Sequence, residues 1–240
     1  MRTLADAYRR AGLDVLCVDL DPQGNLSDYF DVPADASPTS AEVLGGSARA
    51  AEAIHNGVLP ANLTLAEAEL LLTAKMGREL TLKNALRDVK PAYDLVLVDC
   101  PPSLGLLTVN ALVAADHAVI TSEAEYFSLQ GVEQALEVVE LVRSSLHSGL
   151  DWLGVVLNIA DMRLVHSKEA LRSLQDRFGQ RVFDTVIRRS VRYAESAERG
   201  VSMLDYAPEL GADYLALADE LLVRLGGLEA QRERLAAVLG

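Results

Sequence analysis

An apolar run that ends in two carboxylates constrains this chain more than any other feature. Residues 15–25 read Val-Leu-Cys-Val-Asp-Leu-Asp-Pro-Gln-Gly-Asn. The pattern predicts a buried strand that brings Asp19 and Asp21 to the edge of a sheet, on one side of the strand because side chains alternate. Open α/β sheets bind ligands at the carboxyl ends of their strands. The alternative interpretation is a strand that ends in a solvated turn.

A second segment has the same design. Residues 93–103 read Tyr-Asp-Leu-Val-Leu-Val-Asp-Cys-Pro-Pro-Ser, so an apolar run ends in Asp99 and then in prolines, which stop a strand. An apolar strand followed by Asp is the pattern of a Walker B element, whose carboxylate holds Mg²⁺ directly or through water. Two strand-terminal acid sites in one chain favour a metal–nucleotide site over coincidence.

Strand and helix patterns alternate along the chain. This alternation predicts an α/β fold with a mainly parallel twisted sheet and helices on both faces. Because we see no repeat and no linker, residues 1–240 are expected to form a single domain. The expected strands are 13–19, 62–65, 94–98, 117–121, 153–157 and 182–186, and the expected helices are 3–11, 39–44, 48–55, 78–89, 106–114, 129–148, 168–178, 192–199, 210–225 and 229–239.

The composition is acidic, with a formal net charge of −13 and only four lysines. Such a surface is typical of halophile-like proteins adapted to high salt, and equally of an ordinary acidic cytoplasmic protein. The charge argues against broad affinity for nucleic acid, because phosphate binding needs cations, but it leaves room for a local basic patch. No apolar run reaches about 18 residues and no signal pattern opens the chain, so we expect no membrane contact.

Four segments resemble motifs of the ParA/Soj partition ATPases, the deviant Walker A class of P-loop NTPases that includes the cell-division ATPase MinD. Residues 18–25 resemble the second motif of that family, and residues 99–112 its Walker B element with the following helix. Residues 125–131 and 182–204 resemble two later motifs. Together the four segments extend the resemblance nearly from end to end.

The resemblance implies roles for the acidic residues in an ATP and Mg²⁺ site. Asp21 takes the position of the carboxylate that orients the attacking water, and Asp19 lies deeper, near the magnesium shell or a loop lysine. Both are therefore candidate catalytic residues. Asp99 takes the position of the Walker B acid that holds the metal through water, so the candidate metal ligands are Asp99 and Asp19.

Two further sets of residues follow from the resemblance. Asn158 follows an apolar strand, near the place where related ATPases contact adenine, although an Asn that completes a turn fits equally well. Ser190 stands where the family has an Asn, in a stretch that helps to contact the base. The same stretch concentrates three arginines that fit a phosphate contact with DNA or, alternatively, ion pairs with Glu195, Glu198 and Asp184. These arginines are Arg188, Arg189 and Arg192.

The phosphate loop of the family does not occur in these residues. The ATPases carry a Lys-Gly-Gly-Val-Gly-Lys-Thr loop between a first strand and a first helix, and Met1 falls inside that helix. We therefore expect an N-terminally truncated domain that lacks its first strand and binds ATP poorly. One explanation is a displaced start with a complete loop upstream, which we favour, and the other is a degenerate paralogue.

The intact protein implied by the resemblance is an ATPase of chromosome or plasmid partitioning. It forms an ATP-dependent dimer that binds DNA non-specifically on the nucleoid, and a ParB-like protein stimulates its hydrolysis of ATP. One alternative is a pseudo-ATPase, a non-catalytic paralogue that serves as a protein-interaction module. A weaker alternative is a MinD-like positioning ATPase.

Overall fold

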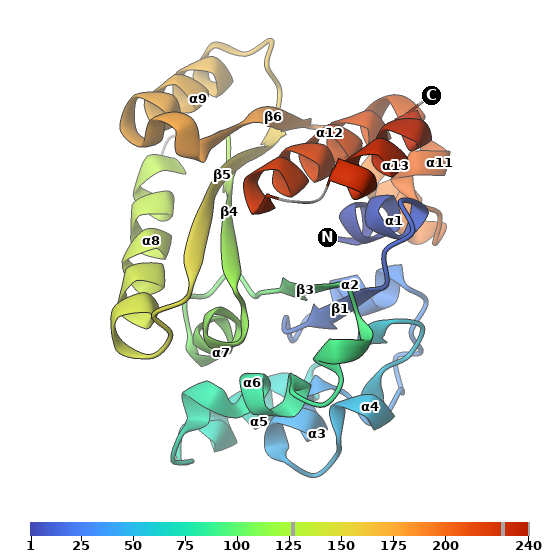
Figure 1. Ribbon diagram of the computed structural model, residues 1–240, viewed down its shortest axis with the longest axis vertical. Helices are drawn as coiled ribbons and strands as arrows, with labels where there is room; N and C mark the ends of the chain where they lie inside the picture. Colours follow the sequence, from blue (N-terminus) through green and yellow to red (C-terminus); the bar gives the residue numbers. More distant parts are fainter. Residues whose placement is uncertain (126–127, 227–228, 240) are drawn as a thin grey trace. The chain divides into compact units, whose positions relative to one another are not determined.

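A computed structural model describes residues 1–125, 128–226 and 229–239 of the chain (Figure 1). The chain divides into two compact units. The first comprises residues 1–9 and 13–116, and the second comprises residues 10–12 and 117–240. Each unit has its own three-stranded sheet, and every pairing between strands in both sheets is parallel. The predicted α/β class with parallel sheets is therefore confirmed.

The sheet of the first unit has the order β2-β1-β3. Strand β1 (Val15–Asp19) lies in the middle and is buried along its whole length, as its apolar and β-branched residues predict. It pairs with β2 (Val58–Leu59) on one side and with β3 (Leu95–Asp99) on the other. Among the described residues β3 pairs with β1 alone, and its side chains are only half-buried.

Helices and short turns cover the first sheet. Leu16 and Val18 of β1 point into a core that is completed by apolar side chains of α3 to α7. On α1, Arg9 donates hydrogen bonds to the carbonyl oxygens of Val15 and Gly57, and so ties the helix to the strands. The elements are α1 (Arg2–Arg10), α2 (Asn25–Tyr29), α3 (Ser40–Gly45), α4 (Ala50–Ala53), α5 (Thr64–Leu72), η1 (Arg78–Leu80), α6 (Thr81–Leu86), η2 (Lys90–Ala92) and α7 (Leu106–Ala114).

The second unit has a sheet of order β4-β5-β6, made of β4 (His117–Glu123), β5 (Asp151–Ala160) and β6 (Val182–Arg188). Its long helices lie on both faces, with α8 and α9 on one side of the sheet and α12 on the other (Figure 1). The elements around the strands are α8 (Ser128–Ser145), α9 (Val165–Phe178), η3 (Gly179–Arg181), α10 (Arg192–Glu198), α11 (Met203–Tyr206), α12 (Pro208–Leu225) and α13 (Glu229–Leu239).

Most expected elements are present, and one prediction is wrong. The strand predicted at residues 62–65 is a turn that leads into α5, because the Asn62 side chain accepts hydrogen bonds from both the amide and the hydroxyl of Thr64. The strand of this region is the two-residue β2, a few residues earlier. Helices α2, α5 and α11 were not anticipated from the sequence. The expected single domain stays a prediction. In the described part of the chain we find no helix long and apolar enough to span a membrane.

Candidate functional site

The two predicted acid sites meet at one edge of the first sheet. In the parallel register of β1 and β3, Asp19 lies directly opposite Asp99 at the carboxyl ends of both strands. The ladder continues one step further, where the amide of Leu20 donates to the Asp99 carbonyl oxygen at 2.9 Å. Asp21 follows at once, and its negative charge helps to raise the pKa of Asp99. The fold thus brings all three aspartates to the same edge of the sheet.

Asp19 is the buried anchor of this group, with 0% of its surface exposed. One carboxylate oxygen accepts the amide of Asp21 at 3.0 Å. The other accepts the amide of Ser27 at 3.0 Å and its hydroxyl at 2.7 Å. Burial raises the pKa of Asp19, although these three hydrogen bonds favour the ionised form. Both oxygens are already used inside the protein, so the role of Asp19 as a metal ligand stays a prediction.

Ser27 links the turn between β1 and α2, which contains Asp21 and which we call the acid turn, to the segment after β2. Its hydroxyl donates to Asp19 and accepts the amide of Ala61 at 2.9 Å. Gly24 lies between the two acids and Ser27, with φ at +67°, and a Cβ there would lie 2.8 Å from the Ala61 carbonyl oxygen. Glycine is therefore needed at this position for its backbone conformation and for the close approach. Ser27 is not among the residues predicted from the sequence, where its only signal is a small hydroxyl residue a short turn after the carboxylates.

Helix α2, which carries Ser27, is also held by an aromatic contact. The ring of Phe30, at the carboxyl end of α2, has the guanidinium carbon of Arg2 at 5.1 Å and that of Arg9 at 5.0 Å from its centroid. Both distances are in the range of cation–π attraction. The contacts fix α2 against α1, and with it the turn that contains Asp21.

Asp21 is partly exposed and keeps one oxygen available. Its Oδ1 accepts the amide of Gln23 at 2.9 Å, and its backbone carbonyl accepts the amide of Gly24 at 2.9 Å. This arrangement is an Asx turn, which fixes the direction of the carboxylate. Among the described residues no donor is bonded to the second oxygen of Asp21. That oxygen can therefore accept a hydrogen bond from a water or bind a cation.

Asp99 has a half-buried carboxylate with no hydrogen-bond donor among the described residues. Its pKa is raised by burial and by the charge of Asp21, and lowered by the α-amino group of Met1. Mg²⁺ in nucleotide sites is held by one or two carboxylates, with waters and phosphate oxygens as the other ligands. Asp99 and Asp21 fit that chemistry. The described residues hold no cluster of three or more His, Cys, Asp or Glu that would bind a metal by itself.

Cations that would face a triphosphate are missing from the sequence around this site. Residues 11–48, which include β1, the acid turn and α2, contain no Lys and no Arg. Phosphate binding relies on such cations or on the amides of a Gly-rich loop. In these 240 residues the candidate site therefore has carboxylates, but neither a Gly-rich loop nor a cation in the surrounding sequence.

The predicted base-contact residues lie in the second unit. Asn158 is near the carboxyl end of β5, opposite Glu123 of β4, and the next residue, Ile159, has φ at +53°. A positive φ at a β-branched residue is a strained conformation of the kind that clusters at functional sites. Ser190 follows β6, and its hydroxyl accepts the amide of Arg192 at 3.2 Å. Their contact with a base stays a prediction.

The three predicted DNA-contact arginines differ in their surroundings. Arg188 pairs with Asp213 at 2.8 Å, and Arg192 pairs with Glu209. Both acids belong to α12, so the ion pairs are not those predicted with Glu195, Glu198 and Asp184. Arg189 is exposed and forms no salt bridge with a described residue. Hydrogen bonds from Arg163 lower the pKa of Asp161, and the charge of Arg189 lowers it further.

Comparison with known proteins places these features in context. The family model described as an AAA domain matches residues 2–152. The sporulation initiation inhibitor protein Soj of Bacillus subtilis is 39% identical to this chain over 219 residues, which are 88% of this chain and 87% of Soj.

Two solved structures are similar in fold. One is a cobyrinic acid a,c-diamide synthase from Mycobacterium smegmatis with bound ADP and magnesium, with a TM-score of 0.74 and 34% identity, and the match covers 82% of this chain and 85% of that chain. The other is the septum site-determining protein MinD from Pyrococcus horikoshii, complexed with Mg-ADP. Its TM-score is 0.75 at 25% identity, and the match covers 93% of this chain and 89% of that chain.

The bridging hydroxyl of Ser27 makes a testable contribution to stability. Ser27→Ala leaves the Ala61 amide without its acceptor and removes one donor from Asp19, so the free energy of unfolding in urea should fall by about 1–3 kcal/mol. Ser40→Ala is the matched control, because the Ser40 hydroxyl is also buried and no described residue forms a hydrogen bond with it. Equal losses in both variants would show that Ser27 acts by packing alone.

The environment of Asp99 predicts that removing its charge raises the free energy of unfolding by an amount that depends on pH. Because the pKa of Asp99 is higher in the folded chain, its ionised form destabilises the fold at neutral pH. This cost disappears below the pKa of the unfolded chain, about 3.9. Asp99→Asn should raise the free energy of unfolding at pH 7, and the gain should shrink as the pH falls to about 4. Urea unfolding at several pH values measures it, with the exposed Asp88→Asn as control. A gain that does not change with pH would contradict this account.

Proposed function

Because this chain belongs to the ParA/Soj family of partition ATPases, we propose that it acts in chromosome or plasmid partitioning through an ATP-dependent dimer that binds DNA. The observation that carries the proposal is the register of β1 and β3. It sets Asp19 beside Asp99 at the carboxyl ends of adjacent parallel strands, where such sheets bind their ligands. A solvated turn alone does not require two paired acids with raised pKa values.

The three carboxylates take different parts in the proposed site. When bound, Mg²⁺ would neutralise charge on the phosphates of ATP, and Asp99 would hold it through a water. Asp21 would accept a hydrogen bond from the attacking water on its unpaired oxygen and so orient it. Asp19 would act as a positioning residue, since it holds the Asp21 amide and α2. The ADP and magnesium bound in the MinD and synthase structures support a magnesium–nucleotide site in this chain.

The polypeptide itself is proposed to bind ATP weakly. Its 240 residues have no Gly-Lys-Thr loop, and residues 11–48 supply no cation. In a polypeptide that carries the family's loop upstream of Met1, the same carboxylates would act on a fully held triphosphate. The base would then contact the segment of Asn158 and Ser190.

DNA and a ParB-like stimulating protein are the proposed partners of the nucleotide-bound dimer. The proposed DNA contact is the segment of Arg188, Arg189 and Arg192 in the second unit. Arg189 is the strongest candidate, because its guanidinium is exposed and has no ion-pair partner among the described residues, whereas Asp213 and Glu209 neutralise the other two. A dimer contacts DNA through two subunits and therefore binds it more tightly than a monomer does. Hydrolysis that separates the subunits would lower the affinity for DNA.

The role of Asp21 can be tested in a polypeptide extended upstream through a Lys-Gly-Gly-Val-Gly-Lys-Thr loop. Asp21→Ala should lower ATP turnover by about 100-fold or more, because the attacking water loses the group that orients it. ATP-dependent dimers, measured by sedimentation, should persist. The exposed loop variant Asp35→Ala should keep normal turnover.

Two outcomes would overturn that role for Asp21. Loss of nucleotide binding in Asp21→Ala would make it a binding residue, and unchanged turnover would remove it from the reaction. If the extended polypeptide does not hydrolyse ATP at all, even with DNA and a ParB-like protein present, the chain is a non-catalytic paralogue.

The proposed DNA face predicts a specific salt dependence. Arg189→Ala should weaken binding of the nucleotide-bound dimer to DNA and reduce the slope of log affinity against log salt by about one for each phosphate that the variant no longer neutralises. Fluorescence anisotropy with a labelled duplex at several salt concentrations measures both quantities. Arg143→Ala, on α8, is the control. An unchanged slope in Arg189→Ala would place the DNA-binding face elsewhere.

A further inference from the structure

Helix α5 is apolar on two opposite sides. Leu65, Ala68 and Leu72 face the core of the first unit and are buried. Their spacing leaves Leu70 on the opposite side of the helix, where a helix of a soluble protein ordinarily carries polar residues. Apolar side chains on the outer side of a helix are unfavourable in contact with water. This free-energy cost is removed when a ligand or partner covers them.

The outer side of α5 carries three exposed leucines around Glu67, and we call this side the α5 outer face. Leu63, just before the helix, is 70% exposed, Leu70 is 72% exposed and Leu71 is 73% exposed. Helical spacing sets Leu63 and Leu70 two turns apart on one line, with Glu67 between them. Exposed apolar side chains grouped in this way mark interaction sites, whereas isolated exposed leucines need no explanation.

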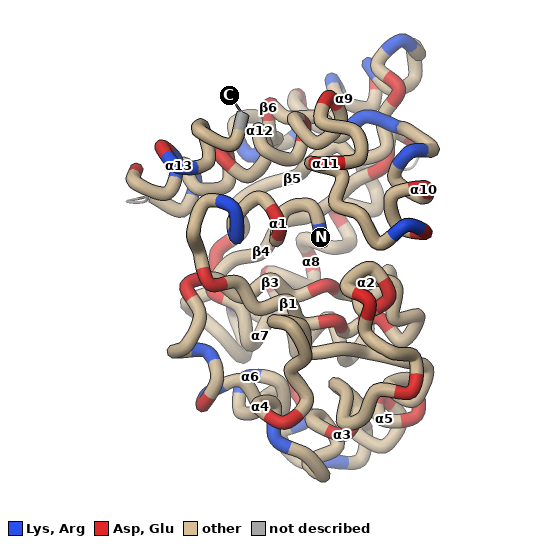
Figure 2. The backbone as a smooth tube through the Cα atoms, turned by 90° about the vertical axis from the view of Figure 1, so that its right-hand side faces the viewer, with Lys and Arg blue, Asp and Glu red and all other residues tan. Residues whose placement is uncertain are grey.

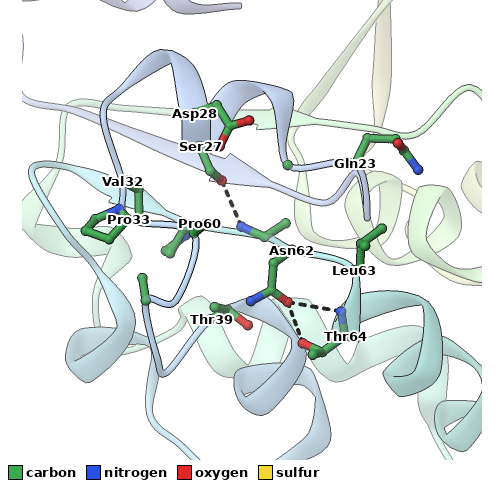
Figure 3. Close-up of a pocket in the computed structure, with 14 residues that line it drawn as sticks. Gln23, Ser27, Asp28, Val32, Pro33, Thr39, Pro60, Asn62, Leu63 and Thr64 are labelled. Carbon is green, nitrogen blue, oxygen red and sulfur yellow. Dashed lines mark hydrogen bonds between the residues drawn. The ribbon is translucent and has the colours of Figure 1, made fainter.

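A pocket adjoins the α5 outer face (Figure 3). Its volume is about 380 Å³. Asn62, Leu63 and Thr64 line it, and the Thr64 amide donates a hydrogen bond to the Asn62 side chain. Apolar walls from Val32 and Pro33 complete it, and Asp28 is the charged residue among those that line it. Since Leu63 lines both, the pocket and the outer face form one surface.

The segment from β1 through α5 is strongly acidic. Residues 11–74 contain ten Asp and Glu and a single Lys or Arg, which is Arg49. The next cations along the chain are Lys75, which donates to the Gly45 carbonyl oxygen, and Arg78, which pairs with Glu79 at 3.0 Å. Arg49 is paired with Glu52 at 2.6 Å and offers no free cation. Asp28 and Glu67 have no described cation as partner, and acidic residues lie along α2 and α5 (Figure 2). A ligand that covers the leucines here is attracted if it is basic and repelled if it is acidic.

We propose that the α5 outer face and its pocket bind a basic amphipathic segment of a partner protein. Apolar side chains of the segment would cover Leu63, Leu70 and Leu71, and a Lys or Arg would face Glu67. A second cationic side chain would enter the pocket, with its aliphatic stem on Pro33 and its charge at Asp28. DNA and anionic lipid surfaces do not fit, because their charge has the same sign as this region.

The surface is connected to the acid site. Gln23 and Gly24 of the turn that follows Asp21, together with Ser27 of α2, line the pocket. A docked segment would therefore contact the turn that orients Asp21. This link to catalysis rests on the proposed function, whereas the docking itself does not depend on nucleotide.

The probe for this surface is a fluorescein-labelled peptide of about 14 residues, made of Leu and Lys at helical spacing and titrated with the full chain in the absence of nucleotide. Leu70→Ser combined with Leu71→Ser should weaken binding about tenfold or more, because the segment no longer covers two central apolar side chains. The control is Leu141→Ser combined with Leu146→Ser, which changes two exposed leucines of the second unit and should leave the affinity unchanged.

Charge variants test the same surface independently. Asp28→Asn combined with Glu67→Gln should weaken peptide binding and flatten its salt dependence. Glu137→Gln combined with Asp176→Asn removes the same charge from exposed positions of the second unit and should have less effect. All replaced side chains are exposed, and circular dichroism checks that each variant is folded.

Two results would overturn the proposal. Equal affinity of the wild type and the Leu70→Ser, Leu71→Ser variant would show that the peptide binds by net charge alone. Self-association of the wild type that this variant abolishes, measured by sedimentation, would assign the face to a second copy of the chain. Because no arm uses ATP, a failed nucleotide site leaves these outcomes unaffected.

Discussion

The parallel pairing of β1 with β3 is the constraint on which the candidate site depends. Two apolar strands are aligned so that each ends in an aspartate at the same level, and the ladder continues for one residue past them. Burial raises the pKa of Asp99, and the charge of Asp21 raises it further, so the ionised form of Asp99 is costly in this place. The fold tolerates this cost because Asp19 is surrounded by donors, while Asp99 and Asp21 retain oxygens that a ligand can use.

Ser27 gives this arrangement its rigidity. One hydroxyl oxygen serves the buried acid and the amide of Ala61, so the acid turn, α2 and the segment after β2 are joined at a single atom. The same segment continues through Asn62 into α5 and its exposed leucines. The candidate chemistry and the proposed partner surface are therefore neighbours in one unit, and this arrangement follows from a few hydrogen bonds.

The sequence predicted the parts that depend on local pattern. Strands β1 and β3 and the aspartates at their ends follow from apolar runs and proline stops, and α7 has the predicted bounds because its apolar residues and flanking signals agree. Side-chain hydrogen bonds decided where the prediction failed. Asn62 caps a turn where a strand was expected, and Arg188 and Arg192 pair with acids of α12 that are distant in sequence. Periodicity carries no information about such long-range partners.

The contacts at Phe30 have a consequence for how the first unit responds to acid. Guanidinium groups stay charged at any pH a protein survives, and an aromatic ring does not titrate, so this attachment of α2 is indifferent to protons. The second attachment of α2, from Ser27 to the Asp19 carboxylate, weakens when that carboxylate is protonated. Of the two attachments, only the one through Ser27 therefore depends on pH.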